Sequence, residues 1–276
     1  MSTKVAVVGA TGRMGQLVTK IVRETEGFEV FAEIGSTGQL TEMLGADIAV
    51  DVTIPGVSQG VVDFAVANGI GVLVGTSGWS SDRIARLERT LAGNTASGVL
   101  IIPNFSVGSV LATSFAAMAA RFFDSIEIVE AHHSTKIDSP SGTAVRTAEL
   151  ISVSRAALGP VAAPHTDQRA RGQQVASVPI HSLRLRGILA KQDVFFGGTG
   201  ETLTIGHETI SASSYEAGIL IAIRAVREAR GVTVGLDQLI DLGTGPLAKP
   251  AGESKSHASR VSDQPSGQAA TATSAP

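Results

Sequence analysis

The stretch from Glu130 to Thr143 concentrates side chains that can move protons and hold an anion. It contains two histidines, one lysine and two carboxylates, followed by a turn of small residues. Each titratable group costs free energy when it is buried without a partner, so a purely structural segment rarely contains so many of them. A histidine exchanges a proton near neutral pH, and Lys136 adds a positive charge. The stretch therefore predicts a proton-transfer site beside an anion.

The two histidines, His132 and His133, lie at the end of a strand that we predict over residues 126–132. If the strand continues through both, their side chains leave on opposite faces, so that one can serve the chemistry while the other holds substrate or supports the scaffold. Asp138 is placed either to orient Lys136 or to cap the next turn. A pair of hydrogen-bonded core histidines is the structural alternative. Zinc is disfavoured, because adjacent histidines on a strand cannot easily ligate one ion and cysteine is absent.

A helix start follows the histidine pair directly. Ser141 or Thr143 is suited to be the N-cap of a helix that we predict over residues 143–157. Free backbone amides at such a helix end form a site for a carboxylate group. The sequence thus predicts an anion site next to the predicted proton carriers.

The second informative stretch is a glycine loop near the N-terminus, in which Gly9, Gly12 and Gly15 follow the pattern G-x-x-G-x-x-G. It lies between a Val-rich strand predicted over 4–8 and an amphipathic helix predicted over 12–23. At such a turn a pyrophosphate approaches bare amides at the helix N-terminus, and a Cβ would obstruct it. The placement predicts dinucleotide binding, and a plain tight turn is the alternative.

The end of the second strand, predicted over 28–34, normally contacts the ribose of a bound dinucleotide. Glu33 lies close to this end and is suited to the 2′-hydroxyl of NADH, whereas Gly35 and Ser36 leave room for a 2′-phosphate. We therefore expect NADPH to be accepted, with NADH as the other cofactor that the sequence allows.

The N-terminal part of the chain alternates short apolar strands with amphipathic helices. This alternation predicts a parallel sheet that is covered by helices on both faces. Ligands bind outside the carboxyl ends of such strands, so the turns at Gly75–Ser77 and Ile102–Phe105 are expected to flank the nicotinamide. The predicted strands are 4–8, 28–34, 48–53, 71–74 and 99–102, and the predicted helices are 12–23, 57–68 and 82–91.

After Val107 the regular alternation of short strands and helices stops, and a predicted Ala-rich helix precedes the histidine stretch. The last three strands are separated by short turns and predict an antiparallel meander. Residues 159–178 are polar and predict an exposed loop, and residues 244–276 lack hydrophobic periodicity and predict a disordered tail. The predicted helices here are 111–123, 143–157 and 217–230, and the predicted strands are 126–132, 180–189, 193–196 and 202–210.

Bulk composition limits the function classes. A net charge of -3 over 276 residues disfavours nucleic acid, because phosphate binding calls for a basic surface. The absence of cysteine excludes disulfides and a thiolate nucleophile and fits the cytoplasm. No apolar stretch is long enough to span a membrane, and the N-terminus lacks a signal-peptide pattern. We therefore expect a cytoplasmic protein that binds neither nucleic acid nor membrane.

Together, the two stretches resemble one family, the bacterial 4-hydroxy-tetrahydrodipicolinate reductases, also called dihydrodipicolinate reductases. The motif His-His-x-x-Lys-x-Asp-x-Pro-Ser-Gly-Thr is highly specific, whereas the glycine loop alone is not. The resemblance covers about residues 4–242. The segments that carry it are Gly9–Gly15, Gly75–Ser77, Pro103–Ser106, Glu130–His133 and Lys136–Ala144.

This resemblance implies hydride transfer from NADH or NADPH to a cyclic imine-type dicarboxylate with loss of water, in lysine and diaminopimelate biosynthesis. It implies a homotetramer built by pairing the sheets of the second domains. The fold class that we predict is α/β, with a Rossmann-like parallel-sheet nucleotide domain and a mixed α+β domain containing an antiparallel sheet. The predicted domains are 1–105, completed by 214–243, and 106–213.

Carried over position by position, the resemblance implies that His132 is the general acid/base and Lys136 a proton donor. No metal is expected. The expected substrate contacts are His133, Ser141, Gly142 and Thr143. The expected cofactor contacts are Gly9, Ala10, Thr11, Gly12, Arg13, Met14, Ser36, Gly75, Thr76, Ser77, Ile102, Pro103, Asn104 and Phe105.

The chain departs from the family pattern in two places. Many members carry an acid or an arginine after the second strand, where this chain has Gly35 and Ser36, so the choice between the two cofactors stays open. The tail over 244–276 is extra. Two alternatives remain at this point: another NAD(P)-dependent reductase of amino-acid metabolism with the same fold, and a non-catalytic dinucleotide-binding regulator.

Overall fold

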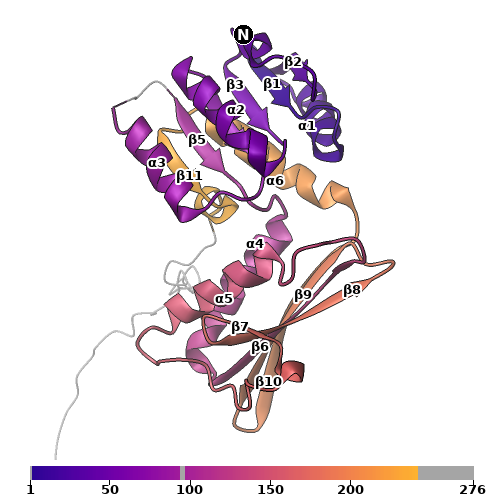
Figure 1. Cartoon of the computed structure of the whole chain (residues 1–276), viewed down its shortest axis with the longest axis vertical. Coiled ribbons are helices and arrows are strands. Elements are labelled where there is room, and N and C mark those ends of the chain that lie inside the picture. Colours follow the sequence, from indigo (N-terminus) through magenta and orange to yellow (C-terminus); the bar gives the residue numbers. More distant parts are fainter. Residues whose placement is uncertain (1, 94–96, 242–276) are drawn as a thin grey trace, which may run out of the picture. The chain divides into compact units, whose positions relative to one another are not determined.

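The computed structural model describes residues 2–93 and 97–241 (Figure 1). Its first sheet has six strands, all parallel, in the order β11-β5-β4-β3-β1-β2. The strands are β1 (Thr3–Val8), β2 (Phe28–Ile34), β3 (Ile48–Asp51), β4 (Gly71–Val74), β5 (Gly98–Ile101) and β11 (Gly231–Val234). The helices packed on it are α1 (Arg13–Glu24), α2 (Pro55–Ala67), α3 (Ser81–Leu91) and α6 (Glu216–Val226).

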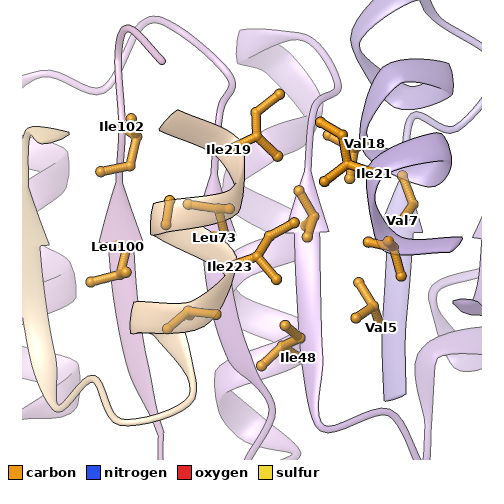
Figure 2. Close-up of a cluster of buried hydrophobic side chains, with 14 of the residues drawn as sticks. Val5, Val7, Val18, Ile21, Ile48, Leu73, Leu100, Ile102, Ile219 and Ile223 are labelled. Carbon is orange, nitrogen blue, oxygen red and sulfur yellow. The ribbon is translucent and has the colours of Figure 1, made fainter. Parts of the chain in front are cut away.

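Helices cover both faces of this sheet, as the alternation predicts. From Val5 to Val8, β1 is buried, and its residues alternate between the face covered by α1 and α6 and the face covered by α2 and α3. Figure 2 shows Ile219 and Ile223 of α6 and Val18 of α1 packed on the first of these faces. This packing holds α1 against the sheet and so fixes the glycine turn that precedes it.

The second sheet has five strands in the order β10-β9-β6-β8-β7. Two helices, α4 (Val107–Ala119) and α5 (Gly142–Ser154), share one apolar cluster with its inner face. Its strands are β6 (Ser125–His133), β7 (Gln173–Val175), β8 (Val178–Leu185), β9 (Ala190–Gly198) and β10 (Glu201–Thr209). The short 3-10 helices are η1 (Leu40–Met43), η2 (Ala120–Phe122), η3 (Arg169–Arg171), η4 (Ala212–Tyr215) and η5 (Leu236–Leu239).

The predicted antiparallel meander of the last three strands is wrong in its order. The strands β9 and β10 do form an antiparallel hairpin, but β6 lies between β8 and β9. It pairs in parallel with β8 and antiparallel with β9, so the second sheet is mixed. Local periodicity identifies strands and not their neighbours, because an earlier strand can insert between two later ones.

The predicted exposed loop over 159–178 contains one strand, β7, and the 3-10 turn η3. The strand β7 returns to β8 through Ala176 and Ser177, whose φ angles are 49° and 69°. Tight hairpin turns of this kind are usually marked by glycine or asparagine. Neither glycine nor asparagine is present at these two positions, so the sequence did not predict this hairpin.

Several further boundaries differ from prediction, among them those of β8, β9, α4 and α6. The helix α4 begins at Val107 rather than at residue 111, because the Ser106 hydroxyl accepts a hydrogen bond from Ser109 N at 3.2 Å and caps the helix. The helix α6 ends at Val226 rather than at residue 230, and the chain then forms β11 at the edge of the first sheet.

Among the described residues, no helix is both long and apolar enough to cross a membrane. The tail predicted over 244–276 lies outside the described residues. The domain boundaries proposed from the sequence remain predictions.

Candidate functional site

The turn between β1 and α1 has the form that a dinucleotide pyrophosphate needs. Gly9 has a φ of 88°, which L side chains rarely adopt. A Cβ on Gly15 would lie 2.6 Å from the Ala10 Cα, so the helix packs directly on the turn. The N-cap, Gly12, provides no side-chain cap, and no acidic residue lies in the first turn of α1. The helix N-terminus is therefore open to an anion.

The residues at the end of β2 are those expected to contact the ribose of a bound cofactor. The carboxylate of Glu33 forms an ion pair with Arg23 of α1, so this carboxylate already has a partner within the protein. Ser36 is exposed in the turn after β2. A Cβ on Gly35 would lie 3.3 Å from the Thr11 side chain, which places the glycine turn beside this end of the strand.

Asp51, which the sequence analysis did not single out, links the carboxyl ends of β3 and β4. It is fully buried, and its Oδ1 accepts hydrogen bonds from Thr53 Oγ1 at 2.6 Å and Thr76 Oγ1 at 3.0 Å. The Ser58 hydroxyl donates to its other oxygen, and Trp79 Nε1 donates to Ser58 at 3.0 Å. The hydroxyl of Thr76, a predicted cofactor contact, is thus engaged in holding the scaffold.

Replacing Asp51 with alanine is expected to lower the free energy of unfolding by roughly 2–4 kcal/mol, because several buried donors lose their acceptor together. Urea denaturation followed by circular dichroism measures this change. Asp63→Ala is the control, because Asp63 is exposed and accepts a hydrogen bond from Gln59 Nε2 at 2.9 Å. Similar losses in both variants would contradict a special role for Asp51.

One cavity of about 420 Å³ combines residues of α1 and of the turns after β4 and β5 with residues of the second sheet and the start of α5. Positive charge comes from Arg13, Lys136 and Lys191, and none of the described residues that line the cavity is aspartate or glutamate. The cavity is therefore suited to a ligand that carries several negative charges. The predicted site residues that line it are Arg13, Met14, Gly75, Pro103, Asn104, Phe105, His132, His133, Lys136, Ser141 and Thr143.

Other predicted residues lie outside this lining. The side chain of Ile102 belongs to the hydrophobic core, which leaves only its backbone for a ligand. The remaining residues of this group lie on the glycine turn, after β2 and β4, or at the start of α5. They are Gly9, Ala10, Thr11, Gly12, Ser36, Thr76, Ser77 and Gly142.

His132 lines the cavity and contacts a buried carboxylate behind it. Its Nδ1 lies 2.6 Å from Glu130 Oε2, and Arg184 forms an ion pair with the same carboxylate. Burial alone would raise the pKa of Glu130, but hydrogen bonds from His132, Arg184 and Ser182 lower this pKa to about 2. Glu130 is therefore ionised at neutral pH and provides a fixed negative charge behind the imidazole.

Lys136 follows the strand in a turn and is oriented by a carboxylate, which is one of the two roles expected for Asp138. Its Nζ lies 2.6 Å from Asp138 Oδ1. The Lys136 ammonium lowers the pKa of Asp138, so that this carboxylate stays charged at neutral pH. His133 Nδ1 lies 2.8 Å from the Thr135 hydroxyl. Both histidines line the cavity, although they are consecutive on β6.

The start of α5 brings backbone amides to the same cavity. Ser141 is the N-cap, with its hydroxyl accepting from Ala144 N at 3.2 Å. Thr143 is a helical residue, and its hydroxyl accepts from Asn104 Nδ2 at 3.4 Å. Asn104, which follows β5, therefore connects the carboxyl end of the first sheet with the predicted anion site.

The opposite wall of the cavity was missed by the sequence analysis. Gln192 on β9 lies directly opposite both Glu130 and His207 in the strand register. Its Nε2 donates to Thr147 Oγ1 at 3.0 Å, and within the described residues its buried Oε1 has no hydrogen-bond partner. His207 Nε2 lies 3.2 Å from Ser106 Oγ, and burial lowers the pKa of this histidine. Only the register, which the sequence does not encode locally, reveals this wall.

Comparison with known proteins gives one family. Two models of this family match the chain. The model described as "Dihydrodipicolinate reductase, N-terminus" matches residues 3–105, and the model described as "Dihydrodipicolinate reductase, C-terminus" matches residues 108–240. The 4-hydroxy-tetrahydrodipicolinate reductase of Clavibacter sepedonicus is 67% identical over 100% of both chains. The reductase of that name from Streptomyces avermitilis is 44% identical over 87% of this chain and 98% of its own.

Among solved structures, a dipicolinate-bound dihydrodipicolinate reductase from Paenisporosarcina sp. TG-14 has the same fold. It is similar with a TM-score of 0.73 and 27% identity, covering 87% of this chain and 100% of its own.

Proposed function

This chain belongs to the dihydrodipicolinate reductase family, and we propose that it reduces 4-hydroxy-tetrahydrodipicolinate to tetrahydrodipicolinate in lysine and diaminopimelate biosynthesis. The reaction takes up one hydride and one proton and releases one water molecule. The reductant is a nicotinamide dinucleotide. The observation that carries the proposal is the cavity that joins His132 and Lys136 to Arg13 and Met14 after the glycine turn, with no carboxylate among the described residues that line it.

The glycine turn supports a bound dinucleotide. We assign the pyrophosphate to the uncapped N-terminus of α1, with Arg13 adding positive charge beside it. Gly75 follows β4 and Phe105 follows β5, and both line the cavity, where they would flank a bound nicotinamide. When bound, the reduced nicotinamide supplies the hydride, and the protein supplies position and charge.

The second sheet holds the substrate and provides the proton. The start of α5 and the ammonium group of Lys136 attract the carboxylates of a diacid. Hydride arrival at the ring places negative charge on the conjugated system, and His132 delivers the proton that neutralises this charge. Lys136, oriented by Asp138, is assigned as a second proton donor.

The test is a coupled assay in which substrate is generated fresh and loss of the reduced cofactor is followed by absorbance. Turnover that pyridine-2,6-dicarboxylate inhibits supports the proposal, because this planar diacid mimics the expected ring. Turnover of a different substrate without that inhibition would indicate another reductase of the same fold. Stoichiometric cofactor binding without any turnover would indicate a regulator.

We propose that both NADPH and NADH are used. The exposed Ser36 leaves space for a 2′-phosphate, and the pairing of Glu33 with Arg23 removes the carboxylate that would repel it. The ratio of kcat/KM for the two cofactors measures this. A ratio beyond about a hundredfold in either direction would contradict dual use.

We also propose a homotetramer located in the cytoplasm. The face of the second sheet away from α4 and α5 exposes Leu183, Leu185 and Phe195, which are 45%, 47% and 43% exposed. Apolar side chains on one sheet face favour burial against a second copy. Light scattering after size exclusion measures the assembly, and cell fractionation tests the location.

A further inference from the structure

Glu130 is a buried carboxylate that contacts several parts of the proposed site at once. Its Oε2 lies 2.6 Å from His132 Nδ1 and accepts from Arg184 Nη1 at 2.9 Å. Its Oε1 accepts from Arg184 Nη2 at 2.9 Å and from the backbone N–H of Ser141 at 3.3 Å. One carboxylate thus touches both the proposed proton donor and the N-cap of α5, where the substrate's carboxylate is assigned.

Arg184 holds this carboxylate with a two-pronged contact that the parallel pairing of β6 and β8 makes possible. Arg184 lies opposite His132 in the register, so its guanidinium reaches back to Glu130 on the same face of the sheet. Its Nη2 also donates to the backbone carbonyl of Asp138 at 2.7 Å. The turn that carries Lys136 is therefore held by the same arginine.

The ionised state of Glu130 determines which nitrogen of His132 carries a proton. An ionised carboxylate only accepts hydrogen bonds. The partners of Glu130 keep its pKa near 2, so that at neutral pH it accepts from His132. The proton of a neutral His132 must then be on Nδ1, and Nε2, which has no hydrogen-bond partner among the described residues, is left for a ligand.

We propose that Glu130, clamped by Arg184, is a positioning residue that fixes His132 in the Nδ1–H form with Nε2 free to exchange a proton, and that ties this imidazole to the start of α5. The proposal deepens the proposed function and rests on it for its catalytic consequence. A buried carboxylate behind an imidazole has the same task in hydrolases with a Ser-His-Asp triad.

Glu130→Gln reverses the tautomer of His132 without a large change in shape. Both partners of Glu130 Oε1, Arg184 Nη2 and the backbone N–H of Ser141, can only donate, so the single carbonyl oxygen of glutamine takes the Oε1 position. The amide NH2 then faces His132 Nδ1, which must accept, and the proton moves to Nε2. We expect kcat to fall by roughly tenfold to a thousandfold, because His132 delivers a proton only after Nε2 has taken one up, and the glutamine does not stabilise the resulting imidazolium as the Glu130 carboxylate does.

The first measurement uses the wild-type protein without ligands, selectively labelled with nitrogen-15 histidine. At a pH above the titration of His132, the ring nitrogens of the Nδ1–H and Nε2–H forms have different chemical shifts and coupling patterns. His132→Gln identifies the signal by its disappearance. We expect the Nδ1–H form in the wild type and the Nε2–H form in Glu130→Gln.

The second measurement is steady-state kinetics with a matched control. Glu127, on the same strand, contacts an arginine and a histidine, Arg171 and His181, but it does not line the cavity. Glu127→Gln therefore removes a comparable charge pair on the other face of the sheet, opposite Phe195, and light scattering after size exclusion checks that this variant keeps the wild-type assembly. We expect it to keep kcat within about twofold of the wild type. In Glu130→Gln we expect the cofactor KM to stay within about twofold while kcat falls.

Three results would overturn the proposal: an Nε2–H form in the wild-type protein, a folded Glu130→Gln variant with wild-type kcat, or an equal loss of kcat in Glu127→Gln. If Glu130→Gln does not fold, the tautomer of His132 in the wild-type protein alone decides whether the proposal stands. The tautomer is read in the absence of substrate. A failure of the proposed function would appear as missing turnover in the wild-type protein. It is therefore distinguishable from a failure of the proposal about the tautomer of His132.

Discussion

Replacing His132 with glutamine is expected to lower kcat by roughly two to four orders of magnitude, while KM for the substrate changes little. Glutamine is of similar length, and its NH2 group can still donate to Glu130, so the buried carboxylate keeps a donor. The amide cannot deliver a proton at neutral pH. The loss should therefore appear in the chemical step, measured as kcat at saturating substrate and cofactor.

The control for this variant is His165→Gln, in which the same change is made at an exposed histidine that does not line the cavity. Its kcat should stay within about twofold of the wild type. A folded His132→Gln variant with wild-type kcat would remove His132 from proton transfer and leave Lys136 as the remaining candidate.

Placing a single methyl group on Gly12 is expected to raise KM for the cofactor by roughly tenfold or more without unfolding the protein. Gly12 has ordinary extended angles, φ -76° and ψ 167°, and a Cβ there would lie 3.4 Å from the Gly9 oxygen. The protein itself thus accommodates alanine. The added carbon would instead lie where the pyrophosphate must approach the amides of α1, and cofactor titration under saturating substrate measures the effect.

Two other glycines provide the controls. Gly15→Ala places a Cβ 2.6 Å from the Ala10 Cα, which is backbone and cannot move aside, so we expect roughly 3 kcal/mol or more of lost stability. Gly60→Ala adds its Cβ to open space on α2 and should be silent or slightly stabilising. If Gly12→Ala leaves the cofactor KM unchanged, the loop is a plain tight turn.

Much of the first sheet could be predicted because its signals are local. The strands β2 and β4 have the predicted limits, since β2 alternates exposed with less exposed residues, β4 is a short apolar run, and a glycine follows each. The boundary of α4 was harder, because the cap at Ser106 precedes a glycine that reads as a helix breaker. The neighbours of β6 could not be predicted, because pairing depends on contacts between residues far apart in sequence.

The residues of the candidate site also differ in whether a local sequence signal predicts them. His132, Lys136 and Ser141 are found from one continuous motif, and all three line the cavity. Arg184 and Asp51 act through other residues, and only the folded register brings each to its partners. An arginine on a strand or an aspartate at a strand end carries no signal of its own in a single sequence.

The parallel pairing of β6 with β8 has a consequence for the chemistry. Antiparallel neighbours can be joined by a hairpin, whereas parallel neighbours need a crossover, and here α5 forms that crossover. A turn leads from the end of β6 at His133 to the start of α5 at Gly142, just as the glycine turn leads from β1 to α1. Under the proposed function, this strand–turn–helix arrangement is used twice: the N-terminus of α1 would hold the cofactor's pyrophosphate, and the start of α5 would hold a carboxylate of the substrate.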